Sequence, residues 1–92
     1  MTLEYLQEHW QEYAIEIDVY FPKENRHIKD CMVLKERFFV CFISKEDDAL
    51  IFDPGGNNPA VVIFRLKGED ECHLKFPGGT WGKIGRFVRL KE

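Results

Sequence analysis

Apolar and polar residues follow two different periods along this chain, and the period changes near residue 14. The apolar positions of the first segment recur at the spacing of one helical face: Leu3, Leu6, Trp10 and Tyr13. Thr2 is a suitable N-cap, and the aromatic pair is typical of a helix that packs on a sheet. From residue 15 to residue 21 apolar and polar residues alternate until Pro22. The pattern therefore predicts an amphipathic helix followed directly by a strand with one exposed face.

Six further apolar runs follow, separated by turn-like segments. They cover residues 27–34, 37–44, 49–52, 60–66, 72–76 and 84–90. No second helical pattern is available to connect parallel strands, so an antiparallel arrangement is favoured. We expect an α+β fold in which the N-terminal helix packs on a twisted antiparallel sheet, or small barrel, of about six to seven short strands.

The run from Phe38 to Ile43 has no polar alternation. Strands with two covered faces are typically apolar throughout. We therefore expect this run to form a central strand, covered by other strands on one face and by the helix on the other.

Two turns share a pattern of phenylalanine, proline and paired glycines, at residues 52–56 and 76–79. Proline ends a strand, and glycine permits the positive φ of a tight turn. The second turn leads into a segment that combines one aromatic, a hydroxyl and three cations: Thr80, Trp81, Lys83, Arg86 and Arg89. This segment is either a ligand site or a corner of the sheet in which Trp81 covers the core and the glycines form a bulge.

Length and composition are those of one small domain, residues 1–92, with enough apolar residues for one core. The three cysteines all lie in apolar runs, which is typical of reduced thiols in a cytoplasmic protein. The first 12 residues do not resemble a signal peptide, and no apolar run is long enough to span a bilayer. We expect a cytoplasmic location without membrane association.

Charge is distributed unevenly along the chain. Residues 1–24 contain six acids against one lysine, whereas residues 75–91 contain five lysines and arginines and no acid. Each end could attract a partner of opposite charge, or both could be ordinary solvated faces. The acidic candidates for partner binding are Glu8, Glu12, Glu16 and Asp18.

No motif supports a catalytic or cofactor site. The segment from Gly78 to Ile84 resembles a phosphate loop, but its spacing is one residue short, and Ile84 replaces the magnesium-binding hydroxyl. Only His27 and Cys31 approach the spacing of metal ligands, and Ser44 has no marked base beside it. We expect no enzyme activity, no metal and no cofactor.

Two functions remain. The first is a non-catalytic inhibitor, of the immunity-protein, antitoxin or anti-defence type, that neutralises a larger protein such as a basic toxin or nuclease through the acidic residues. The alternative is a module that binds a nucleotide or single-stranded nucleic acid through Trp81 and the C-terminal cations. The sequence leaves the partner and the oligomeric state open.

Overall fold

The computed structural model describes residues 1–57, 61–76 and 78–91. Its elements, in chain order, are α1 (Leu3–His9), the 3₁₀ turn η1 (Trp10–Glu12), β1 (Tyr13–Phe21), the 3₁₀ turn η2 (Pro22–Glu24), β2 (Arg26–Val33), α2 (Leu34–Arg37), β3 (Val40–Ser44), β4 (Ala49–Asp53), β5 (Val62–Lys67), β6 (Glu71–Lys75) and β7 (Trp81–Arg89). The strands form one antiparallel sheet in the order β2-β1-β7-β6-β5-β4-β3. The expected α+β fold is confirmed, and the sheet is open and not a barrel.

The N-terminal helix begins as its sequence predicts. The Thr2 side chain accepts a hydrogen bond from the backbone N–H of Tyr5 at 3.1 Å, which is the N-cap interaction. The helical face is buried: Leu6, Trp10 and Tyr13 all belong to the core. The α-helix ends at His9, earlier than the apolar spacing suggests, and η1 carries Trp10 into the core.

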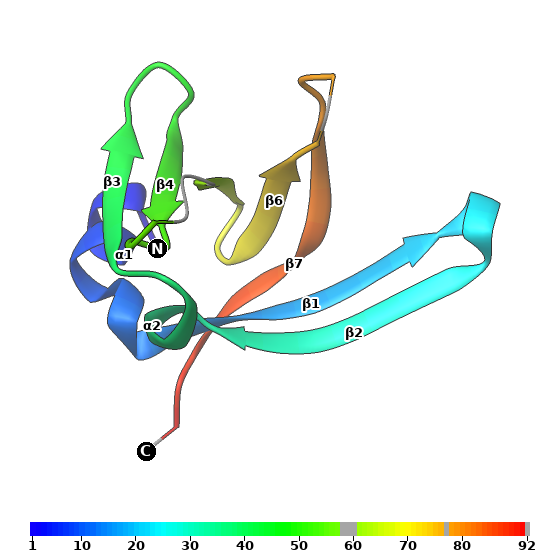
Figure 1. The fold of residues 1–92 in the computed structure, drawn as a ribbon, viewed down its shortest axis with the longest axis horizontal. Coiled ribbons are helices and arrows are strands. Elements are labelled where there is room, and N and C mark those ends of the chain that lie inside the picture. Colours follow the sequence, from blue (N-terminus) through cyan, green and yellow to red (C-terminus); the bar gives the residue numbers. More distant parts are fainter. Residues whose placement is uncertain (58–60, 77, 92) are drawn as a thin grey trace.

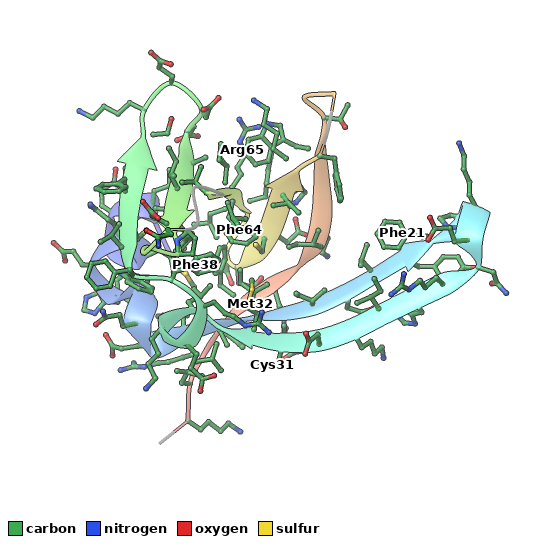
Figure 2. All side chains as sticks on the ribbon, viewed as in Figure 1. Phe21, Cys31, Met32, Phe38, Phe64 and Arg65 are labelled. Carbon is green, nitrogen blue, oxygen red and sulfur yellow. The ribbon has the colours of Figure 1, made fainter. Side chains whose placement is uncertain are left out.

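The core is centred on aromatic rings contributed by several elements. The ring of Phe52 on β4 lies 5.7 Å from Trp10, 5.1 Å from Phe38 and 5.6 Å from Phe64, measured between centroids. Phe38 and Phe64 lie close together in Figure 2. Edge-to-face packing of this kind adds to the free energy gained from burial. The helix and η1 therefore cover the inner face of the sheet.

The apolar run from Phe38 to Ile43 is not a central strand. Its regular part is β3, which lies at one end of the sheet and, within the part of the chain that the structure describes, pairs only with β4. Cys41 and Ile43 pack on the core, whereas 53% of the surface of Phe42 is exposed. The expectation of a central position was wrong, because the outer face of this strand is apolar without being covered.

The strand β7 contains a β-bulge. Gly85 pairs with Cys72, and Lys83 pairs with His73, so that Ile84 is the extra residue on β7. Both Ile84 and Gly85 are buried. The bulge lets two successive residues face the core and turns Lys83 and Arg86 outward.

The hairpin of β1 and β2 projects from the rest of the molecule, as Figure 1 shows. β1 pairs with β7 only as far as Ile17, opposite Gly85, whereas its pairing with β2 continues to Phe21. We call residues 18–29 the arm. Beyond the last pair with β7, the arm is a two-stranded ribbon.

Candidate functional site

The acidic and basic ends of the chain lie side by side, because β1 and β7 are neighbours in the sheet. Glu12 accepts a hydrogen bond from the Arg89 guanidinium at 3.1 Å, and Glu16 lies 4.0 Å from Arg86. Two acids of residues 1–24 thus pair with two cations of residues 75–91.

Three of the four acidic candidates have cationic or histidine neighbours. Hydrogen bonding to His9, aided by the charge of Arg89, lowers the pKa of Glu12. A hydrogen bond with His27 lowers the pKa of Asp18. Glu16 faces Arg86, and Glu8 is exposed on α1 without an ion-pair partner among the described residues. Glu8 lies on α1 and Glu12 on η1, whereas Glu16 and Asp18 share one exposed face of β1, so the four acids are spread over three elements.

The cations of the alternative site are likewise engaged. Lys83 lies 2.9 Å from Glu71, and this hydrogen bond lowers the pKa of that carboxyl group. Arg86 lies 4.0 Å from both Glu16 and Asp70. Surface ion pairs are individually weak, but each one reduces the positive potential that would attract a phosphate backbone.

Trp81 lies on the outer face of β7. It pairs with exposed Lys75, whereas the next pair along, Leu74 with Gly82, faces the core. The guanidinium of Arg65 lies 4.1 Å from the centroid of the Trp81 ring, in cation–π contact. One face of the indole is thus already occupied, and Trp81 is not the cover over the core that one interpretation expected.

Arg65 is itself held in place. One of its terminal nitrogens donates to the backbone carbonyl of Asp47 at 2.6 Å, which ties β5 to the β3–β4 turn. Its Nε is buried without a hydrogen-bond partner in the described structure. Figure 2 shows the side chain in the region flanked by β4 and β6. The cation–π contact and the hydrogen bond to Asp47 therefore hold Arg65 against Trp81 on the outer face of the sheet.

The glycine turns have the backbone conformations that their sequences predict. Gly55 and Gly56 have φ of 75° and 64°, and Gly78 and Gly79 have φ of 94° and 82°. Pro77 of the second turn and residues 58–60 after the first lie outside the described residues. Thr80 is exposed, and its carbonyl accepts the N–H of Phe76 at 2.7 Å, closing the turn.

An apolar patch lies on the outer face of β3, β4 and β5. In the register, Phe42 is opposite Ile51, and Ile51 is opposite Ile63. Val40 on β3 has the same facing and is opposite Asp53, and Val61, which directly precedes β5, is 49% exposed. We call this set the outer patch: Val40, Phe42, Ile51, Val61 and Ile63. Two of its members, Phe42 and Val61, are exposed and the other three are partly buried. Exposed apolar side chains that gather on one face are typical of protein-binding sites.

A hollow of about 330 Å³ adjoins the outer patch. It is lined by Val61, Val62, Ile63, Leu74, Lys75 and Phe76. The ring of Phe76 lies against the backbone of Gly82, where a Cβ would be only 2.6 Å from the ring. Gly82 thus lets Phe76 pack closely on β7 and form one wall. Among the described residues that line it, the Lys75 amine is the one charged group.

Comparison with protein-family models, curated proteins and solved structures finds no match. The surface of the molecule alone therefore carries the functional argument.

A second hollow, of about 620 Å³, lies between η1, α2 and the end of β7. Its lining is mixed in charge: Gln11, Glu12, Val33, Lys35, Glu36, Arg89, Leu90 and Lys91. It brings together Glu12 and Arg89, which the sequence assigned to two different sites. Their ion pair lies in its wall, and the described lining carries three cations against two acids.

The buried cysteines and Ser44, the remaining candidates for catalysis, lie in the core or within a turn. Burial raises the pKa of the Cys41 thiol to about 12 and also raises that of Cys72. The Ser44 hydroxyl lies 3.3 Å from both the carboxylate and the backbone N–H of Asp47, within the β3–β4 turn. Among the residues that the structure describes, no cluster of three or more His, Cys, Asp or Glu could hold a metal. In the same residues, no helix has the length and apolar character of a membrane span.

The sequence missed the outer patch as a site. Its signal was present in the lack of polar alternation between Phe38 and Ile43. We interpreted that signal as burial on both faces, because burial is the commoner cause of a continuously apolar strand.

Proposed function

We propose that the protein is a non-catalytic binding protein that inhibits a larger protein by covering one of its surfaces. The observation that carries this proposal is the outer patch, with Phe42 at 53% exposure on an edge strand of the sheet. Aromatic side chains beside a small hollow are typical anchors of protein interfaces. The free edge of β3 also offers backbone groups that could pair with a strand of the partner.

The chemistry of the outer patch indicates what the partner presents. The hollow beside Val61 and Ile63 suits an apolar side chain, and the Lys75 amine at its border suits a carboxylate. A partner with an apolar segment next to an acidic residue fits this surface. A basic toxin attracted by Glu12, Glu16 and Asp18 is less well supported, because these acids already face His9, Arg86, Arg89 or His27.

Binding of nucleic acid has less support than binding of protein. Lys83, Arg86 and Arg89 each face an acid, and Arg65 covers one face of the Trp81 ring. We expect the tryptophan fluorescence to stay unchanged when oligonucleotides or nucleotides are added at low salt. A saturable change that weakens as salt rises would favour nucleic acid instead.

We place the protein in the cytoplasm on the basis of its cysteines. All three are free, and Cys31 is exposed. An exposed free thiol is stable in a reducing compartment and reactive in an oxidising one. Fractionation of cells that express the protein from its own gene tests this location.

The test of binding is affinity capture with matched variants. Phe42→Ser removes the aromatic side chain of the outer patch, and Tyr20→Ser removes a similarly exposed aromatic of the arm, since their exposures are 53% and 54%. We expect a stoichiometric protein partner to be retained by the parent and by Tyr20→Ser and lost from Phe42→Ser. A Lys75→Glu variant should also weaken capture.

Two results would contradict the proposal. Absence of any stoichiometric partner from lysates of the native host would argue against a binding function. Loss of the partner from Tyr20→Ser, with retention by Phe42→Ser, would show that another surface binds. A variant with neutral replacements at Glu8, Glu12, Glu16 and Asp18 separates the charge-based hypothesis from the apolar one, because it should retain the partner.

A further inference from the structure

The arm is paired to fewer strands than the middle of the sheet. Beyond the pair of Ile17 with Gly85, β1 and β2 have no other strand than each other as a partner among residues 1–57, 61–76 and 78–91. A two-stranded ribbon is at best marginally stable in water. β2 is also the last strand of the sheet, so its outer edge has unpaired backbone groups among the described residues. Figure 1 shows this edge running along the whole length of the projecting hairpin.

One face of the hairpin is apolar and continues the core outward. The face that begins with buried Ile15 also carries half-buried apolar side chains: Ile17, Val19, Phe21, Ile28 and Met32. Phe21 lies at the distal end of the arm in Figure 2. Met32, on this face, and Cys31, on the other, lie on opposite sides of β2.

Two charged residues of β2 interrupt this apolar face. Arg26 is opposite Phe21, and Asp30 is opposite Ile17. Both are exposed, and neither forms an ion pair with another described residue. They are four residues apart on an extended strand, about 13 Å, too far to pair within one chain.

A second copy could pair with β2 in only a few ways. Directly opposed residues of an antiparallel ladder have their side chains on the same face of the sheet. When β2 pairs with its own copy about a two-fold axis, one residue must therefore lie opposite itself, and we call this residue the centre. Centres at Arg26, Lys29 or Asp30 place a charged residue opposite its own copy. A centre at His27 places Glu24 opposite Asp30. All four of these registers oppose like or identical titratable groups, which is unfavourable.

Two centres remain near the middle of the strand, Cys31 and Ile28. They differ in whether Arg26 and Asp30 lie opposite a residue of opposite charge. A centre at Cys31 places Asp30 opposite Met32 and leaves both unpaired charges unmatched. A centre at Ile28 places Arg26 of each copy opposite Asp30 of the other, on the same face and at both ends of a five-residue ladder. The Ile28 centre also opposes His27 to Lys29 on the other face, but among the centres considered it alone adds cross-strand pairs of opposite charge, which stabilise a ladder.

We propose that two copies of this chain associate through the free edge of β2, antiparallel and centred on Ile28. The ladder joins Arg26 to Asp30 in both copies and makes one sheet of the two molecules. On the other face it places His27 opposite Lys29, and Asp18 lies next to both in the same chain. The pairing turns each two-stranded arm into half of a four-stranded ribbon and unites the two apolar faces.

Exchange of charges tests the register. Arg26→Glu or Asp30→Arg alone places like charges opposite each other twice across the two-fold axis, and each should weaken the dimer about tenfold or more. The double variant restores opposite charges and should restore dimerisation. An equimolar mixture of the two single variants should also associate, because each supplies the charge that the other lacks. Sedimentation velocity over a range of concentrations measures all four.

A cysteine at the centre tests the geometry independently. Residue 28 of one copy would be about 4.5–5.5 Å from residue 28 of the other, Cα to Cα, within reach of a disulfide. In a Cys31→Ser background, Ile28→Cys should form a covalent dimer under mild oxidation. Lys23→Cys, at the tip of the hairpin, should not, since it lies opposite residue 33 of the other copy in this register.

Several outcomes would overturn the proposal. A monomer at every concentration would do so, as would single charge variants that dimerise like the parent. Efficient disulfide crosslinking through native Cys31 would show that the pairing is centred on Cys31 and not on Ile28. Phe42→Ser should leave the dimer intact, so failure of the outer patch to bind a partner and failure of β2 to self-associate are separate results.

Discussion

Replacing Gly85 with alanine tests how the hairpin of β1 and β2 is attached to the rest of the sheet. Gly85 pairs with Ile17 on one side and with Cys72 on the other. A Cβ at this position would meet the carbonyl oxygen of Glu16, and would lie 2.9 Å from its carbonyl carbon and 3.0 Å from the Ile17 Cα. These are backbone atoms, so no side chain can rotate away.

The size of the effect follows from these distances. Non-bonded carbons are most favourable at about 3.5–4.0 Å, so β1 and β7 must separate by roughly 1 Å. Overpacking in a core costs about 1–3 kcal/mol and occasionally more, and separation here also weakens the ladder between the two strands. We expect Gly85→Ala to lower the free energy of unfolding by about 3 kcal/mol, which corresponds to roughly 12–24 °C in the melting temperature of a domain this size.

Gly56→Ala is the matched control. Gly56 has a φ of 64°, and a Cβ there would have no atom of the described residues within 4 Å, so we expect alanine to cost the strain of the left-handed conformation, about 1–2 kcal/mol. Thermal and urea unfolding of the two variants give the comparison. If Gly85→Ala is at least as stable as Gly56→Ala, β1 and β7 do not approach each other as closely as described. The position of the arm, which follows from that approach, would then be wrong as well.

Two further predictions concern pH and thiol reactivity. The pKa values of Glu12, Asp18 and Glu71 are lowered in the folded state. The stability that these carboxylates contribute is therefore fully present above the ordinary carboxyl range, about pH 4, and is lost as pH falls through the lowered pKa values. The melting temperature should drop towards pH 3, and less steeply in Glu71→Gln than in a Glu46→Gln control; equal slopes in the two variants would contradict this. A thiol reagent should modify exposed Cys31 rapidly and the two buried cysteines only on unfolding; rapid modification of a second thiol in folded Cys31→Ser would contradict the burial.

The strands were predictable because alternation and turn residues are local signals. All seven strands overlap the predicted runs, and Thr2 and Pro22 mark ends that the structure confirms. The short helix α2 was missed, since its four residues are too few to show a helical period. Trp81 was placed in a turn but begins β7, because glycines on both sides of it concealed the strand.

Local patterns could not predict the order of the strands in the sheet or which charged side chains form ion pairs. Glu12 and Arg89 are 77 residues apart in sequence, and only the pairing of β1 with β7 brings them together. In the same way, the composition of β3 could not show whether a neighbouring strand would cover Phe42. Both depend on non-local pairing, on which local composition carries no information.

The place of β7 in the sheet has a consequence for how the chain folds. The hairpin of β1 and β2 and the meander from β3 to β7 both consist of strands that follow each other in sequence. β7, the last of the seven in sequence, joins the two groups by pairing with β1. Local hairpins form quickly, whereas pairing over long sequence separations is slow. Until β7 docks, four strand edges are open at once, so the rate of this single step sets how long the chain is exposed to aggregation.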